Sequence, residues 1–258
     1  MGFRFRPGRI VRFLKGDFGK PLIKLKSFVV QIVDLVTKAI IPRRCASCGA
    51  ILVLEGLALP LCPECSKAVF PLEATFDVSS QLARPSACGA KPAMNVTSVF
   101  AYQGLIPALI LKLKYGRAFW LAKDMGRLMA VVSAKYGPFD FIVAVPASPG
   151  RQLKRGYNQA FLLAKEISLV LHTSILPRAI YHKKTNKSQR DLSLAERWER
   201  ASVSFFKGQP FPKGAKILLV DDVVTSGATL TVCADILFEC GASSVTAVTI
   251  ASALTSWA

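Results

Sequence analysis

The sequence is poor in acidic residues. Asp and Glu together number 16 against 34 Lys and Arg, which gives a formal net charge of +18 and an isoelectric point of about 9.9. This excess favours polyanionic partners, namely nucleic acid, phosphorylated ligands or an anionic membrane surface, without choosing among them. The 258 residues are 52% hydrophobic, enough for one large domain or for a main domain with a small companion.

The sequence also lacks an apolar run long enough to cross a membrane. The best candidate, Phe28 to Ile41, is too short and is interrupted by Gln31, Asp34 and Lys38. The basic stretch Met1 to Lys26 has neither the apolar core nor the cleavage site of a secretory signal. No internal repeat is visible. We therefore expect a soluble, cytoplasmic protein without an integral membrane segment.

The first forty residues are a basic arm followed by a helical pattern. Met1 to Lys26 carries eight basic residues against Asp17, a net charge of eight minus one, or +7. This stretch is consistent with an unstructured arm, with an upstream start-site artefact, or with an arm that contacts nucleic acid. Apolar residues between Phe28 and Ile40 repeat with helical spacing, which predicts a short amphipathic helix. That helix would pack on its own protein or, alternatively, bind a membrane surface.

Seven cysteines are present, and four of them form two Cys-x-x-Cys pairs: Cys45 with Cys48, and Cys62 with Cys65. Two intervening residues let both thiolates of a pair turn towards one ion. Two such pairs predict a closed, tetrahedral and therefore structural zinc site in a reducing compartment. Redox-active cysteines, or cysteines without a metal, are the alternatives. Cys88 is expected to be a buried or inert thiol.

The stretch from Lys216 to Leu230 organises the rest of the chain. An unbroken apolar run predicts a strand buried on both faces of a parallel sheet, and it ends in two adjacent carboxylates, Asp221 and Asp222. A small, hydroxyl-rich turn follows, and then a predicted helix from Leu230 to Phe238. The turn consists of Thr225, Ser226, Gly227, Ala228 and Thr229.

The carboxyl end of a parallel strand that opens into a helix is where α/β folds bind ligands. Free backbone N–H groups, the helix dipole and hydroxyl donors would hold a phosphate on the turn. The two carboxylates would face hydroxyl groups or Mg²⁺. An ordinary strand–turn–helix unit with acidic capping is the alternative.

The α/β pattern begins at Val96. We expect strands at Val99 to Tyr102, Phe139 to Pro146 and Val245 to Ile250, and helices at Ile106 to Tyr115, Leu121 to Ala134 and Ala160 to Leu171. A basic loop, Ala147 to Gln159, follows the second strand and is a candidate clamp for pyrophosphate through Arg155 and Gly156. The polar stretch Arg178 to Arg200 predicts a lid over the site or a solvated loop.

The acidic pair and turn resemble the 5-phosphoribosyl-1-pyrophosphate (PRPP) motif of type I phosphoribosyltransferases. In that family the acids hold the ribose hydroxyls and the turn cradles the 5′-phosphate, with Mg²⁺ on the pyrophosphate. Four blocks in order resemble the ComF family of competence proteins: the two cysteine pairs, Leu111 to Tyr115, Arg155 to Gln159, and Asp221 with Asp222. The ComF family is described as a zinc ribbon joined to a phosphoribosyltransferase-like domain, linked to DNA uptake.

The resemblance predicts an α/β protein with a mostly parallel sheet flanked by helices. Residues 1–40 would be the arm and amphipathic helix, 41–92 the zinc ribbon and its connection, and 93–258 the phosphoribosyltransferase-like domain. Two positions depart from the family pattern. Pro85 replaces a cysteine that would precede Cys88, so no second metal site is expected, and Arg200 stands where the family tends to carry asparagine.

Three functions follow from these features. The first is a PRPP-binding protein of cytoplasmic DNA uptake that also binds single-stranded DNA, with competence-machinery proteins as partners. The second is an active phosphoribosyltransferase of nucleotide metabolism with an unknown acceptor, although no residue marks a base or an acceptor site. The third is a regulator that senses PRPP without turnover.

Overall fold

The structure is a computed structural model that describes residues 43–52, 58–72, 94–183, 199, 201–254. Several expected features lie outside the described residues: the basic arm, the amphipathic helix, Cys88 with its connection, and most of the Arg178 to Arg200 stretch. Among the described residues no helix is both long and apolar enough to span a bilayer.

A parallel sheet forms the centre of the fold, with strand order β1-β8-β6-β2-β3. The strands are β1 (Asn95–Ala101), β2 (Phe141–Ala144), β3 (Ser174–Ile175), β6 (Lys216–Val220) and β8 (Ser244–Ser252). A short strand, β7 (Val223–Val224), adds to β8 beyond the end of β6. A separate antiparallel pair is formed by β4 (Ile180–His182) and β5 (Phe205–Lys207).

The central strands are buried on both faces, as their apolar runs predict. Residues Ile217 to Val220 of β6 have no exposed surface, and β6 pairs in register with β2 on one side and β8 on the other. The expected strand at Val245 to Ile250 is confirmed as the core of β8, which lies inside the sheet between β1 and β6. The sheet therefore carries Asp221 and Asp222 at its centre rather than at an edge.

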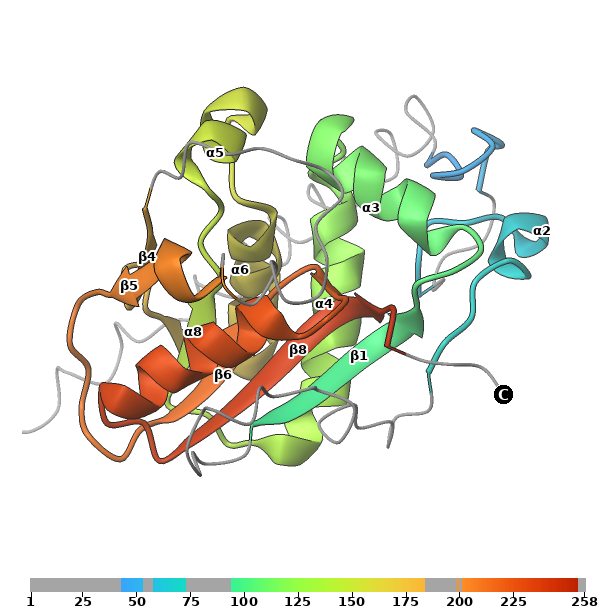
Figure 1. Cartoon of the computed structure of the whole chain (residues 1–258). Coiled ribbons are helices and arrows are strands. Elements are labelled where there is room, and N and C mark those ends of the chain that lie inside the picture. The colour runs from blue at the N-terminus through green and yellow to red at the C-terminus, as the bar shows by residue number, and fades with distance from the viewer. Residues whose placement is uncertain (1–42, 53–57, 73–93, 184–198, 200, 255–258) are drawn as a thin grey trace, which may run out of the picture.

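Helices cover both faces of the sheet (Figure 1). One face packs against α3 (Ile106–Tyr115), α4 (Leu121–Ser133) and α6 (Gln159–Leu171), and the other against α8 (Ala228–Glu239). Gly126 of α4 lets α4 approach α6 closely, since a Cβ there would stand 2.5 Å from the Cβ of Glu166. A single 3-10 turn, η2 (Ala134–Tyr136), extends α4, and the short α2 (Pro63–Ser66) belongs to the cysteine module.

Most expected elements are present, with shifted ends. Helix α3 has the predicted bounds, whereas α8 begins two residues before the predicted start at Leu230. The expectation of a loop over Ala147 to Gln159 is wrong, because α5 (Pro149–Arg155) forms inside it. Pro149 at the first helical position and Gly156 in the left-handed conformation (φ 81°) delimit that helix.

Candidate functional site

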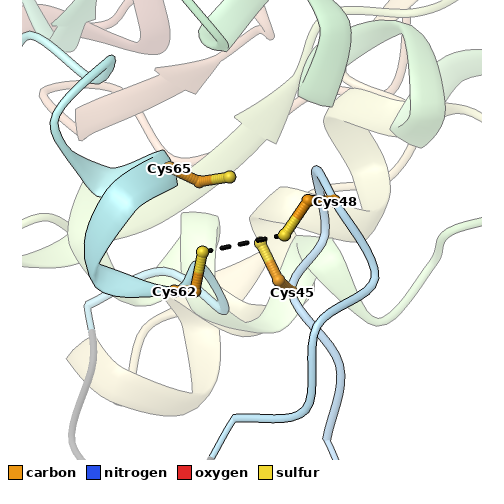
Figure 2. A group of neighbouring side chains, drawn as sticks. All are labelled: Cys45, Cys48, Cys62 and Cys65. Carbon is orange, nitrogen blue, oxygen red and sulfur yellow. Dashed lines mark hydrogen bonds between the residues drawn. The ribbon is translucent and has the colours of Figure 1, made fainter.

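The four predicted metal ligands come together in one cluster. The sulfur atoms of Cys45, Cys48, Cys62 and Cys65 all lie within 4.8 Å of one another, and Figure 2 shows the side chains gathered from two segments of chain. Cys45 and Cys48 lie in a loop closed by the Arg44–Ile51 bridge, while Cys62 caps α2 and Cys65 lies within it. The sequence spacing was therefore sufficient to find this site.

The cluster fits a tetrahedral ion. A metal bound by four sulfurs at about 2.3 Å places those sulfurs about 3.8 Å apart, and the Sγ atoms of Cys48 and Cys62 are 3.7 Å apart. Burial acts to raise the pKa of the Cys45 thiol, but backbone N–H groups of Cys48, Cys62 and Ser47 outweigh it and lower that pKa to about 6. The pKa of Cys65 moves the other way: the hydrogen bond with Ser47 acts to lower it, but contact with Cys62 and burial outweigh that bond and raise the pKa to about 12. The spacing of the four sulfurs is therefore what fits zinc.

The cysteine module is anchored on the main domain through α3. Cys45, Leu59 and Leu61 are buried in the same apolar core as Leu109 and Leu113 of α3. The ammonium group of Lys112 donates a hydrogen bond to the carbonyl oxygen of Ala46, inside the first cysteine pair. A metal in the cluster would therefore support part of the domain core.

The acidic pair lies at the carboxyl end of β6 and is tied to β8. The N–H of Asp221 donates to the carbonyl of Val248 (3.1 Å), and the N–H of Ile250 donates to the carbonyl of Asp222 (3.0 Å). Strand β7 separates the pair from the turn, an element that the sequence pattern did not predict. The backbone around both carboxylates is thus held by the sheet rather than by a free loop.

The two carboxylates have different surroundings. Asp222 is only 5% exposed, and its carboxylate forms an ion pair with Lys114 of α3. Asp221 is partly exposed and accepts a hydrogen bond from the N–H of Asp222 (2.8 Å). Burial raises the pKa of Asp221 well above its usual range, and the adjacent charge of Asp222 raises it further. Asp222 is therefore not open to solvent, contrary to expectation, whereas contact of both acids with a ligand stays a prediction.

The turn that follows has the geometry of an anion site. Gly227 adopts φ 75°, which a side chain would disfavour, and it caps α8 without a side-chain hydrogen bond. The N–H groups of residues 228–230 start the helix, and Ser226 Oγ accepts only a long bond of 3.5 Å from Ala228. Asp221 and residues 223–230 line an open pocket here. Thr225 is exposed, while Ser226 and Thr229 are partly so.

The second predicted loop is fixed by contacts with α3. The Arg155 guanidinium donates to Tyr115 Oη and to Gln159 Oε1, both at 2.7 Å. The Tyr157 hydroxyl donates to the carbonyl of Leu113, and Gly156 ends α5. The N–H of Val145 donates to the carbonyl of Val220 (2.9 Å), so the start of this loop lies beside the end of β6. No contact among the described residues joins Arg155 or Gly156 directly to the turn.

One residue of the site was not assigned from the sequence. Lys114 belongs to the Leu111 to Tyr115 block, but nothing in its local pattern indicates that it contacts Asp222 of the acidic pair. The only available signal was the position of two lysines near a helix end.

The sheet, its terminal acids and the capped turn define a phosphoribosyltransferase-type domain. A profile of the phosphoribosyl transferase domain matches residues 134–258. Competence protein F of Haemophilus influenzae is 33% identical over 142 residues, which are 52% of this chain. The match spans 62% of competence protein F, less than two thirds of its length. The DNA utilization protein YhgH of Escherichia coli is 31% identical over 160 residues, or 60% of this chain and 70% of YhgH.

The chain belongs to the ComF/YhgH family of competence and DNA utilization proteins and carries a phosphoribosyltransferase domain. A purine phosphoribosyltransferase from Pyrococcus horikoshii aligns over 54% of this chain and 78% of its own, with 18% identity and a TM-score of 0.35.

Proposed function

We propose that this protein binds PRPP with Mg²⁺ and acts in a cytoplasmic step of DNA uptake, where it also binds single-stranded DNA. Asp221 and Asp222 receive the ribose hydroxyls. The turn formed by Thr225, Ser226, Gly227, Ala228 and Thr229 holds the 5′-phosphate. Arg155 and Gly156, at the C-terminal end of α5, meet the pyrophosphate and its Mg²⁺.

One observation carries the PRPP assignment. The left-handed Gly227 opens the first turn of α8 directly beyond two carboxylates at the centre of the sheet. Phosphates bind at helix N-termini through backbone N–H groups and the helix dipole. Ribose hydroxyls donate to carboxylates in charge-assisted hydrogen bonds. These two chemistries lie within one short stretch of chain, as a phosphorylated ribose requires.

Zinc in the four-cysteine cluster has a structural role in this proposal. Four thiolates leave no open coordination position for substrate. The protein is then organised as the arm and helix in residues 1–40, the zinc ribbon and connection in 41–92, and the PRPP-binding domain in 93–258. Other competence-machinery proteins are the proposed protein partners.

Calorimetric titration with PRPP and Mg²⁺ tests the site. Gly227→Val should abolish binding because a β-branched side chain crowds the phosphate position and strains the left-handed backbone. Thr225→Ala, a smaller change on an exposed side chain, should weaken binding by about tenfold through one lost phosphate contact. Unchanged affinity in Gly227→Val protein that still melts cooperatively contradicts the assignment.

An active phosphoribosyltransferase with an unknown acceptor is the second candidate, favoured by the domain match over residues 134–258. Positioning and charge stabilisation carry much of such a transfer, so few catalytic side chains need be visible. Release of pyrophosphate from PRPP in the presence of nucleobases separates this candidate from binding alone.

The DNA part of the proposal is supported by the net charge of +18 and by the competence and DNA utilization names of the relatives. Affinity for single strands should fall steeply with salt, since each neutralised phosphate releases counterions. Comparison with a variant that lacks Met1 to Lys26 shows whether the arm or the rest of the chain carries the effect. Salt-independent affinity would contradict the DNA part.

A further inference from the structure

An exposed aromatic and basic surface lies at the connection between α3 and α4. Tyr115, Phe119 and Trp120 are 57%, 46% and 51% exposed, although all three are large and partly apolar. Arg117, between them, is also exposed. Three large exposed rings within six residues are unusual on a surface that contacts only water.

This connection is held in a fixed conformation. Ala118, at its centre, is 7% exposed, and its N–H donates to the carbonyl of Lys112 (3.4 Å) while its carbonyl accepts from Leu121 (3.0 Å). Arg117 adopts φ 51°, a left-handed conformation that is uncommon for a residue with a side chain. The rings are therefore displayed from a short, structured turn.

Helix α5 extends the same surface. Phe119 packs edge to face on Tyr157 with ring centroids 4.7 Å apart, and the Arg155 guanidinium lies 4.6 Å from the centroid of Tyr115. Figure 1 shows α3 and α5 at the same end of the molecule. Arg151 and Lys154 of α5 are exposed there.

Cations outnumber acids in the segments that form this surface. Residues 103–123 contain four Lys and Arg and residues 149–160 contain three, and neither range contains Asp or Glu. The next residue of α4, Asp124, is 9% exposed. The carboxylate of Asp222, which pairs with Lys114 of α3, is buried. Cations and open aromatic faces together are what single-stranded nucleic acid requires, because phosphates need charge and unpaired bases need rings to stack on.

We infer that the surface formed by Tyr115, Arg117, Phe119, Trp120, Arg151 and Lys154 is the single-stranded DNA platform of this protein. Bases stack on the exposed rings, and the cations contact the phosphates. Base stacking is available to every base, so the platform binds without strong sequence preference, whereas a closed duplex cannot present its bases to the rings. This inference rests on the proposed function for the identity of the strand as DNA.

The full chain, loaded with zinc, is titrated with labelled oligodeoxythymidine under fluorescence anisotropy. Trp120→Ala and Phe119→Ala should each weaken binding by about fivefold or more, the range of one lost base stack. Tyr181→Ala is the matched control, because Tyr181 on β4 is a similarly exposed ring (48%) on a different element. The affinity of this variant for the oligonucleotide should stay unchanged. Arg117→Gln should reduce the slope of log affinity against log salt by about one.

Two further measurements separate stacking from charge and from misfolding. An abasic strand of the same length should bind wild-type and Trp120→Ala protein equally, because it offers phosphates but no bases. In a Trp198→Phe/Trp257→Phe background Trp120 is the only tryptophan of the sequence, and its fluorescence should be quenched by the oligonucleotide but not by the abasic strand. Trp120→Phe should retain most of the affinity.

The outcomes distinguish this inference from the proposed function. Wild-type protein that binds no single strand contradicts the DNA part of the proposed function and the platform with it. Wild-type binding that Trp120→Ala and Phe119→Ala leave unchanged, or no quenching of Trp120, overturns the platform alone. PRPP binding is measured in the same variants, and its retention shows that the fold persists.

Discussion

Lys114 of α3 and Asp222, at the end of β6, form an ion pair across more than one hundred residues of sequence. The side chain of Asp222 is 8% exposed and that of Lys114 is 21% exposed, so little water screens the pair. The pair therefore ties α3, which also carries the exposed Tyr115 and the contact to the cysteine module, to the proposed ribose site.

The first prediction concerns this pair. Asp222→Asn should destabilise the fold by roughly 3 kcal/mol, because it leaves a partly buried ammonium group without its counterion. Lys114→Met should cost a similar amount through the unpaired carboxylate. The double variant Lys114→Met/Asp222→Asn should be less destabilised than the sum, as urea unfolding measures. Strict additivity would show that the two charges do not interact.

The sequence was sufficient for the features that depend on local spacing. Two Cys-x-x-Cys pairs predicted all four members of the cluster, and the apolar run before Asp221 predicted the buried strand β6. The sequence could not predict which remote residue would approach the acidic pair, because the Lys114–Asp222 contact depends on how α3 packs over the sheet. Helix α5 was missed although Ser148, Pro149 and Gly156 are ordinary helix-boundary residues.

The second prediction separates the function of Asp221 from its effect on stability. Burial raises the pKa of Asp221 well above the 3.8 of an ordinary carboxyl. The folded protein therefore keeps this proton where the unfolded chain has lost it. The contribution of Asp221 to the free energy of unfolding therefore falls as the pH rises above the ordinary carboxyl pKa. Between that pKa and the raised pKa of the folded protein, the loss is about 1.4 kcal/mol per pH unit.

Asp221→Asn should consequently stabilise the ligand-free protein at neutral pH, since its amide oxygen still accepts from the N–H of Asp222. It should also weaken PRPP binding about tenfold, because it replaces a carboxyl group that would contact a ribose hydroxyl. Thermal melts at acidic and neutral pH, paired with calorimetry, measure both effects. Lower stability of the variant at neutral pH would contradict a raised pKa of the Asp221 carboxyl.

The third prediction concerns the metal. Purified protein should contain one zinc per chain, and Cys62→Ser should lose it and melt at a lower temperature, because Leu59 and Leu61 of the module belong to the core of α3. Cys240→Ser is the matched control, since Cys240 lies outside the cluster. Metal analysis that finds no zinc in wild-type protein, or zinc retained in Cys62→Ser, would refute the four-cysteine site.

The last prediction joins the two sites through α3. Lys112 donates to Ala46 in the cysteine module, and two residues later Lys114 pairs with Asp222 at the proposed ribose site. A shift of α3 after zinc loss would therefore move Lys114 relative to the acidic pair. We expect Cys62→Ser to weaken PRPP binding severalfold although no cysteine contacts that site.

Lys112→Met tests this route without removing the metal. It deletes the contact to Ala46 but leaves the four sulfurs and Lys114 in place, so zinc content should stay at one per chain while PRPP affinity falls in the direction seen for Cys62→Ser. Leu111→Ala is the matched control, because Leu111 is a neighbouring exposed residue of the same helix. PRPP affinity in Lys112→Met equal to that of the control would show that the cysteine module supports the core without acting on the ligand site.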